Sequence, residues 1–475
     1  MTAATVPRSQ RVIADAVTGT RAVSAGARLA VDIGLDILAD GGNAFDAGVA
    51  MVLAEGVALP MKCGLAGDVV ALVCHPDGDL ECLISVGPGA GALDRGAAPE
   101  TVGPTSVGVP GAPAGYARLA DRGRLPLSAL AAPAVRAARE GVAWTPIAVS
   151  LTAEGEALLR RHNDDTAYLP DGRLPRVGET LRLPGLADLI DQFAQLGDAL
   201  FFEANGQILC DRVRRAGGML TPEDLRQRPA AWHAVDSHRF ADGGVLAATP
   251  FPTHGPALLR AAALAVDDRV DPVIAARQAR AAFKGHETDL VAAGTSVVTA
   301  TDEDGASVVI VHSNSFPQYG SGLIVPAWEL VLNNRPGRGF DKRASAAAHH
   351  PAARRVPPTT LHAWALLDDR STLLGATPGG INQMVWNLQC VLEVRNGHAP
   401  ADICRSPRWS LDANDQLAIE ADHADRDRPG SRHAPPRTMT SAQQVIRLRD
   451  GLADVAADTR TGATAGAIAP SGPAS

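Results

Sequence analysis

Aromatic residues are scarce in this 475-residue chain, where Phe, Trp and Tyr together make up 4% of the sequence. We therefore do not expect a platform that stacks the bases of single-stranded nucleic acid. The formal net charge of −8 also disfavours a polyanionic partner such as nucleic acid. The acidic residues are scattered along the chain, so their predicted role is solubility.

Long apolar runs are missing as well. No stretch reaches the ~20 apolar residues that a membrane-spanning helix needs. The first residues, MTAATVPRSQRVIADAV, lack the apolar segment that a signal peptide requires. We therefore expect a cytoplasmic protein without a membrane partner.

The spacings typical of metal ligands are also absent. The 13 histidines form no HxxxH motif, and the six cysteines form no CxxC pair. We expect no metal and no cofactor, and we interpret the cysteines as free buried thiols. The cysteines are Cys63, Cys74, Cys82, Cys210, Cys390 and Cys404.

The residues that are present fit a soluble globular protein, since 46% are hydrophobic and 20% are charged. Apolar spacing predicts a helix over 27–40, and Asn43 is a predicted cap for a second helix that follows. Residues 62–87 are typical of two strands around an Asp-Gly turn. Further helical sequence lies in 124–140 and in pieces of 181–232, where TPEDL (221–225) resembles a helix start.

The second half of the chain is richer in strand patterns. Helical sequence ends near Lys284, and 295–301 and 306–313 flank an acidic turn and predict a hairpin. A second hairpin is expected in 443–458, whereas the last residues, 462–475, are expected to fray. A strand leads into TPGG (377–380), and a helix follows from there. Because strands often follow one another directly, we expect helices packed on antiparallel sheets.

The chemistry centres on the segment VAAGTSVVTATDEDG, in which Thr295 follows Gly294. A Thr hydroxyl is a poor nucleophile without a base. Cleavage before Thr295 would create an α-amine with a pKa of about 7.7–8.0, which suits a base at neutral pH. Gly294 permits the strained backbone of an N→O acyl shift, and the amides of TPGG could hold an oxyanion. The alternative is a Thr-rich strand with no catalytic role.

A series of motifs in sequence order resembles the γ-glutamyltranspeptidase family. They include DILADGGNAFDAGVAM, CGLAGDVVALV, RAGGMLTPEDL, GTSVVTATDEDG, YGSGLIVP, LNNR and ATPGG. The resemblance implies an α+β fold, the four-layer αββα sandwich of N-terminal nucleophile hydrolases. It also implies self-cleavage into a large subunit, 1–294, and a small subunit, 295–475, which together form one domain and act on a small-molecule substrate.

The same resemblance implies roles for individual residues. Thr295 matches the family's nucleophile, and Ser313 matches a hydroxyl residue that supports it. Positions expected to line the site or bind substrate are Asn314, Thr359 and Thr360, and those expected to form the oxyanion site are Gly379 and Gly380.

The sequence departs from the family at the positions that bind a γ-glutamyl group. The family's carboxylate-binding Arg falls at about Gly87, and its amine-binding Asp falls in LNNRPGRGF, which has Arg335 and Arg338 instead. A substrate ammonium near two guanidiniums would be penalised, whereas Arg grips a carboxylate well. We therefore expect an anionic acyl group, with a solvated surface loop as the alternative for both arginines. Val297 replaces a family His.

Two other observations stay open. Asp68 stands where the family has glycine, and a turn role is expected over a role in the site. Family members with non-glutamyl pockets include oxamate amidohydrolase and an enzyme of 4-alkylproline antibiotic pathways that releases an oxalyl unit by C–C cleavage. We hypothesise a similar amide or C–C bond hydrolase. The alternatives are a conventional γ-glutamyltransferase or glutathione hydrolase, and an unprocessed homologue that only binds a ligand.

Overall fold

Two large antiparallel sheets form the centre of this computed structural model, which describes residues 11–95, 99–281, 294–341, 347–368 and 371–469. The eight-stranded sheet has the order β1 (Arg11–Ala14), β22 (Thr464–Ile468), β3 (Arg21–Ala25), β11 (Ser296–Thr301), β12 (Ser307–Ser313), β4 (Asp68–Cys74), β5 (Leu80–Ser85) and β8 (Ala231–Ala234). The seven-stranded sheet has the order β2 (Ala16–Gly19), β21 (Leu452–Ala457), β20 (Gln444–Arg449), β16 (Thr372–Ala376), β15 (Trp364–Leu367), β10 (Val245–Ala248) and β9 (Asp236–Arg239).

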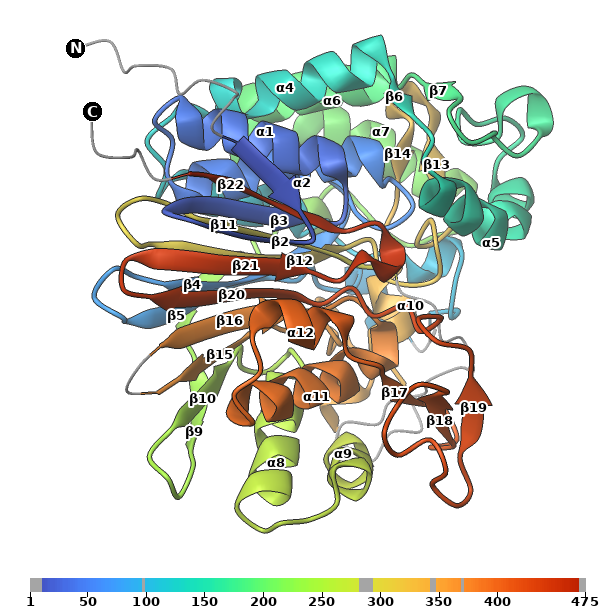
Figure 1. Cartoon of the computed structure of the whole chain (residues 1–475). Coiled ribbons are helices and arrows are strands. Elements are labelled where there is room, and N and C mark those ends of the chain that lie inside the picture. Colours follow the sequence, from blue (N-terminus) through green and yellow to red (C-terminus); the bar gives the residue numbers. More distant parts are fainter. Residues whose placement is uncertain (1–10, 96–98, 282–293, 342–346, 369–370, 470–475) are drawn as a thin grey trace, which may run out of the picture.

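Helices lie on the outer face of each sheet (Figure 1). The helices on the side of the eight-stranded sheet include α1 (Arg28–Ala39), α2 (Ala44–Ala58), α3 (Ala112–Ala120), α4 (Leu127–Glu140) and α6 (Pro184–Leu196). Those on the side of the seven-stranded sheet are α8 (Gly255–Val266), α9 (Pro272–Ala281), α11 (Gln383–Arg395) and α12 (Pro400–Arg405). Within the described residues, no helix combines the length and the apolar character needed to cross a bilayer.

The remaining elements are shorter or peripheral. The other helices are α5 (Pro146–His162), α7 (Glu203–Arg215) and α10 (Arg335–Gly339). Three small sheets join β6 (Val142–Ala143) to β7 (Thr180–Leu181), β13 (Ile324–Val325) to β14 (Leu330–Val331), and β17 (Trp409–Leu411) to β18 (Leu417–Glu420) and β19 (Arg432–Ala434).

The inner faces of the two large sheets pack against each other through small and β-branched side chains. From the eight-stranded sheet come Val70, Val309 and Val311, and from the other come Ala365 and Leu374, all fully buried. Alternate residues of β11, β12 and β4 face this inner core, because successive side chains of a strand point to opposite faces. The outer faces of β11 and β12 pack on α2, and β4 packs on α3.

Several predictions about local structure are confirmed. Asn43 caps α2 in a capping box, since its Oδ1 accepts the Asp46 amide at 3.0 Å and Asp46 Oδ2 accepts the Asn43 amide at 2.9 Å. The strands β11 and β12 pair as the predicted hairpin, and so do β20 and β21. All six cysteines are free and buried.

Three expectations need correction or fall outside the structure. TPEDL does not start an α-helix, because Asp224 folds back to accept the Thr221 amide and only a 3-10 turn forms (Asp224–Arg226). The tail does not fray over 464–468, because β22 pairs with β3 on one side and β1 on the other. The predicted helix end at Lys284 lies outside the described residues, and α9 is described to Ala281.

Removal of the α2 cap tests this reading of the helix start. We expect Asn43→Ala to lower the free energy of unfolding by about 1 kcal/mol, because the Asp46 amide loses its acceptor. Denaturant unfolding measures the change. Thr145→Ala is the matched positive control, because it also removes a helix cap: Thr145 caps α5 by accepting the Ala148 amide at 3.2 Å. An Asn43→Ala effect no larger than that of an exposed substitution would contradict the capping role.

Candidate active site

Thr295 directly precedes β11, at one end of the sheet sandwich, and is 4% exposed. Its Oγ1 donates to Ser313 Oγ at 3.2 Å. Ser313 Oγ in turn donates to the carbonyl oxygen of Gly294 and accepts the Ser315 amide at 2.8 Å. The Ser313 hydroxyl therefore contacts both the predicted nucleophile, Thr295, and the Gly294 carbonyl that Thr295 would attack.

Strand register sets these contacts. Ser296 pairs with His312, so Thr295 lies opposite Ser313 one position further along. Ser313 is also the partner of Asp68 on β4. Thr295, Ser313 and Asp68 thus form a line across three neighbouring strand ends, which we call the edge row. Val297, Val311 and Val70 face the inner core. The residues of the edge row each lie two positions from one of these valines, so their side chains point to the same face.

The second sheet brings further predicted residues to this end of the sandwich. Ala376, the last residue of β16, pairs with Gln444, and Gln444 Nε2 donates to the Val297 carbonyl of β11 at 2.6 Å. TPGG follows directly after Ala376. Thr377 Oγ1 accepts the Ala442 amide at 3.1 Å, which fixes the start of that turn.

The turn itself needs glycine. Gly379 has φ 147° and Gly380 has φ 54°, both in regions that favour glycine. A Cβ on Gly379 would also lie 2.3 Å from the Trp386 ring. The turn leads through a single 3-10 turn (Gly380–Asn382) into α11, so its amides lie at a helix start, where backbone N–H groups lack helical partners.

Thr359 and Thr360 precede β15, which neighbours β16, and are held from two sides. The Thr359 amide donates to the Pro252 carbonyl at 2.8 Å, and Thr360 Oγ1 accepts from Gln383 Nε2 at 3.3 Å. Gln383 begins α11, so the Thr pair and the glycine turn are tied to the same helix start. The structure therefore brings both predicted segments together.

Asn314 is fully buried beside the loop that follows α2. Its Nδ2 donates to the Pro60 carbonyl at 3.2 Å, and its amide donates to the Lys62 carbonyl at 2.7 Å. Its Oδ1 has no hydrogen-bond partner among the described residues. The carbonyl of Asn314 accepts the Asn334 amide at 3.0 Å, so the LNNR segment is fixed directly beside Ser313.

Arg335 is 3% exposed, so the solvated-loop alternative is wrong for this residue. Its Nε donates to Asp68 Oδ2 at 2.7 Å, and Asp68 Oδ1 accepts the Gly87 amide at 2.8 Å. The turn role expected for Asp68 is also wrong, because Asp68 is the fully buried first residue of β4. Burial raises the pKa of the Asp68 carboxyl, while Arg335 and the Gly87 amide act to lower it.

Arg338 is half-buried and lies over the Phe316 ring, with its guanidinium carbon 5.3 Å from the ring centroid. This stacked geometry is typical of a cation–π contact. Both arginines belong to α10, and Asn333 Oδ1 accepts the Arg335 amide at 3.1 Å at the start of this helix. The five-residue helix is thereby fixed to the strand end that carries Asp68.

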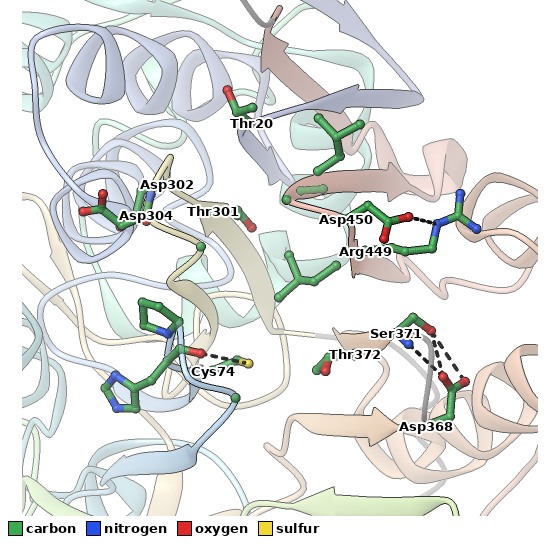
Figure 2. Close-up of a pocket in the computed structure, with 18 residues that line it drawn as sticks. Thr20, Cys74, Thr301, Asp302, Asp304, Asp368, Ser371, Thr372, Arg449 and Asp450 are labelled. Atoms are coloured by element: carbon green, nitrogen blue, oxygen red, sulfur yellow. Dashed lines mark hydrogen bonds and ion pairs between the residues drawn. The ribbon is translucent and has the colours of Figure 1, made fainter.

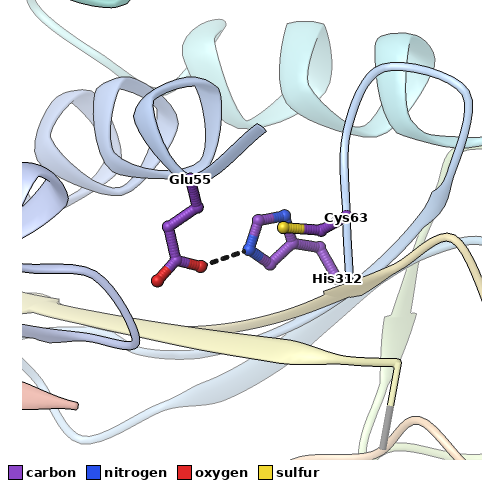
Figure 3. Close-up of side chains that lie close together, drawn as sticks. All are labelled: Glu55, Cys63 and His312. Atoms are coloured by element: carbon purple, nitrogen blue, oxygen red, sulfur yellow. Dashed lines mark hydrogen bonds and ion pairs between the residues drawn. The ribbon is translucent and has the colours of Figure 1, made fainter. Parts of the chain in front are cut away.

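A buried polar chain lies on the opposite face of β12 and was not predicted. His312 Nε2 contacts Glu55 Oε2 at 2.8 Å, and His312 Nδ1 contacts the Tyr116 hydroxyl at 2.8 Å. Glu55 Oε1 also accepts the Gly26 amide at 2.7 Å. The side-chain atoms of Glu55, His312 and Cys63 that could bind a metal ion lie within 4.8 Å of one another (Figure 3). These buried polar side chains lie on the side of α2, whereas the neighbouring Ser313 faces the inner core.

His362 is a second buried polar residue that sequence reasoning missed. Its Nδ1 donates to the Thr360 carbonyl at 2.8 Å, and its Nε2 accepts from Asn387 Nδ2 at 2.8 Å. These two bonds fix a neutral tautomer. Burial lowers the pKa of His362 to about 4. The only sequence signal for this role is a histidine two positions after Thr360.

A separate cavity of about 440 Å³ lies among the turns at the far end of the strands that carry the edge row. Figure 2 shows its lining, which includes Asp302, Asp304, Asp368 and Arg449. Thr301, at the end of β11 opposite Thr295, also lines it. This cavity is distinct from the candidate active site.

A family model described as Gamma-glutamyltranspeptidase matches residues 30–282 and 263–468. These two matches together cover most of the chain. The chain belongs to the gamma-glutamyltranspeptidase family. The resemblance expected from the motifs is thereby confirmed.

Curated relatives carry glutathione hydrolase names. Glutathione hydrolase 3 of Arabidopsis thaliana is 32% identical over 204 residues, which is 41% of this chain and 32% of the plant protein. Glutathione hydrolase 7 of Homo sapiens is 28% identical over 375 residues, which is 66% of this chain and 56% of the human protein. The matches thus span only about a third to a half of these relatives' length.

Two solved structures match over nearly the whole chain. Cephalosporin acylase from Bacillus halodurans has a TM-score of 0.80 at 25% identity, over 97% of both chains. The structure of LmbA2991T421A also has a TM-score of 0.80, at 21% identity over 94% of this chain and 98% of the other. The second match shows the fold alone. Helices and antiparallel sheets are therefore arranged here as in these proteins.

The neutral state of His362 predicts a dependence of stability on pH. The folded-state pKa lies below the usual value of about 6.5, so the unfolded state binds more protons between these values. Stability is therefore full above pH 6.5 and falls as the pH falls towards 4. Between pH 7 and 4.5 this single group accounts for about 2 kcal/mol.

Urea unfolding of wild type and His362→Gln at pH 7 and 4.5 measures this contribution. We expect the variant to lose less stability on acidification, because Gln does not titrate. His254, whose pKa is lowered to about 3 by burial and by the neighbouring His362, remains in both proteins. Equal losses in the two proteins would show that His362 is not held neutral in the folded state.

Proposed function

We propose that the chain is a self-processing N-terminal-threonine hydrolase of its family. In this proposal the precursor is cut between Gly294 and Thr295, and 1–294 and 295–475 remain together as two subunits of one four-layer αββα sandwich. The observation that carries the proposal is the contact of Ser313 Oγ with both Thr295 Oγ1 and the Gly294 carbonyl oxygen. A hydroxyl in this position serves both partners of an N→O acyl shift.

Self-cleavage follows from that geometry. Thr295 Oγ1 attacks the Gly294 carbonyl carbon, and Ser313 accepts the hydroxyl proton while it donates its own hydrogen bond to the carbonyl oxygen. The C–N bond breaks, the proton passes to the released Thr295 nitrogen, and an ester remains. Water then hydrolyses the ester and leaves a Gly294 carboxylate and a free Thr295 α-amine. A Cβ on Gly294 would lie 2.2 Å from the Ser315 carbonyl oxygen, so the position requires glycine.

Thr295 Oγ1, the nucleophile of self-cleavage, is also the nucleophile of catalysis. The Thr295 α-amine takes the proton from Oγ1 as Oγ1 attacks the substrate carbonyl, and it then protonates the leaving group. The Gly379 and Gly380 amides stabilise the oxyanion, with Thr359 and Thr360 beside them. An acyl-Thr ester forms, and water resolves it. Asn314 contributes a buried Oδ1 that is free to bind a substrate donor.

The acyl group in this proposal is small and anionic, of the oxalyl type. Arg335 and Arg338 occupy the segment where the family binds an amine, and both belong to the helix beside the edge row. A guanidinium favours a carboxylate and penalises an ammonium in a partly dry site. We infer an amide or C–C bond hydrolase of 4-alkylproline antibiotic biosynthesis. The rival is glutathione hydrolysis, which the names of the curated relatives favour.

Intact mass of the purified protein tests self-cleavage. We expect wild type to give two fragments, 1–294 and 295–475, and Thr295→Ala to give a single chain. Ser313→Ala should slow the appearance of the fragments by about 100-fold, because one donor to the developing oxyanion is lost.

Thr299→Ala is the matched control for the processing experiment. Thr299 is a buried Thr of the same strand that contacts Ser24 Oγ at 2.7 Å, and its loss should leave cleavage intact. A single uncut wild-type chain would sink the hydrolase proposal and favour the ligand-binding homologue.

Substrate turnover separates the two enzyme classes. We expect the processed protein to release ammonia from oxamate and to leave glutathione intact, because Asp68 is already bonded to Arg335 and to the Gly87 amide, and an arginine cannot accept a bond from the γ-glutamyl ammonium. The two reactions are followed by ammonia release and by liberated glutamate. Efficient glutathione turnover would instead support the conventional enzyme and would refute the charge argument.

A further inference from the structure

Asp68 and Arg335 form a buried ion pair at the end of the edge row. Their side chains are 0% and 4% exposed, and the Nε–Oδ2 distance is 2.7 Å. Both Asp68 oxygens accept an N–H bond, one from Arg335 and one from the Gly87 amide. Each oxygen of this carboxylate thus has one donor, and the two bonds fix its orientation.

The guanidinium partner is not fully satisfied. Arg335 Nη2 is buried and has no hydrogen-bond partner among the residues that the structure describes. A buried donor without an acceptor has lost its hydrogen bonds to water and gained none in the protein. An acceptor oxygen from a ligand would restore a hydrogen bond, so this nitrogen marks a binding position.

The edge row limits how far this position lies from the predicted nucleophile. Thr295, Ser313 and Asp68 lie on three adjacent strands, and neighbouring strands are about 5 Å apart. Asp68 is thus about 10 Å from Thr295, and Arg335 extends from it. A ligand that reaches both positions therefore spans at most about this distance.

We propose that Asp68 and Arg335 act as one specificity-determining unit, which binds a single acceptor oxygen of a short acyl group through Arg335 Nη2. Asp68 offsets the charge of Arg335, so the unit accepts the oxygen of a carboxylate or of a neutral amide. The substrate class is a 1,2-dicarbonyl acyl group, with one carbonyl attacked by Thr295 and the far oxygen on Arg335. This inference rests on the proposed function for the attack by Thr295.

Binding of oxamate and oxamide tests the unit, because the two ligands have nearly the same shape and differ in charge. Titration calorimetry is performed on proteins that all carry Thr295→Ala, because processed protein would hydrolyse oxamate during the titration, and wild type in this comparison has no further substitution. We expect wild type to bind both ligands. In Asp68→Asn, the preference for oxamate over oxamide should rise about tenfold, because the uncompensated guanidinium then favours the anion.

Arg335→Lys provides the second arm. Lys retains the positive charge opposite Asp68, but its single ammonium nitrogen cannot replace Arg335 Nη2. Both ligands should therefore bind at least tenfold more weakly. Asp454→Asn is the control, because Asp454 pairs with Arg447 at 2.6 Å on a strand of the other sheet. Its ligand preference should equal that of wild type.

Three outcomes would overturn the proposal. They are wild type binding neither ligand, an unchanged oxamate preference in Asp68→Asn, and undiminished binding by Arg335→Lys. Failure of the proposed function would look different, since an uncut chain or the absence of turnover appears in mass and ammonia assays. Those assays do not depend on the ratio of the two affinities.

Discussion

The register between β11 and β12 decides which side chains meet at the candidate site. Because side chains alternate between the two faces of a strand, a slip by one residue would exchange Ser313 for His312. The Thr295 hydroxyl would then lose its partner, and a buried imidazole would face the core between the sheets. The same register also aligns Asp68 with Ser313 on the next strand. One pairing therefore orders the nucleophile, its supporting hydroxyl and the acidic residue.

The opposite face of β12 explains why that slip is costly. His312 is buried and bonded to both Glu55 and Tyr116, which are also buried, and Glu55 accepts the Gly26 amide. Removing one member of such a network leaves buried polar groups unpaired, which costs far more than an exposed contact would. The polar chain thus ties the strand end to α2, behind the residues that would perform the chemistry.

Local patterns in the sequence were sufficient to predict those structural elements that are formed by residues close together along the chain. The cap at Asn43 and the hairpin ending at Ser313 rely on contacts within a few residues or across one turn. Pairings between distant segments were not accessible in this way. β22 lies between β1 and β3 only because the chain ends meet, and the neutral His362 depends on Asn387 in α11. Family resemblance supplied Thr295 and the glycine turn, but it could not supply their partners.

The ion pair between Asp68 and Arg335 joins two departures from the family pattern into one physical change. The residues are 267 positions apart, so the sequence presented an acidic residue in place of glycine and a reversed charge as unrelated features. In the fold, the two charges stabilise each other, since an unpaired buried charge is destabilising. A Cβ on Gly111 would lie 2.9 Å from Asp68 Oδ1, so the surrounding loop also leaves space for the carboxylate. The two departures therefore offset each other's charge at the end of β4.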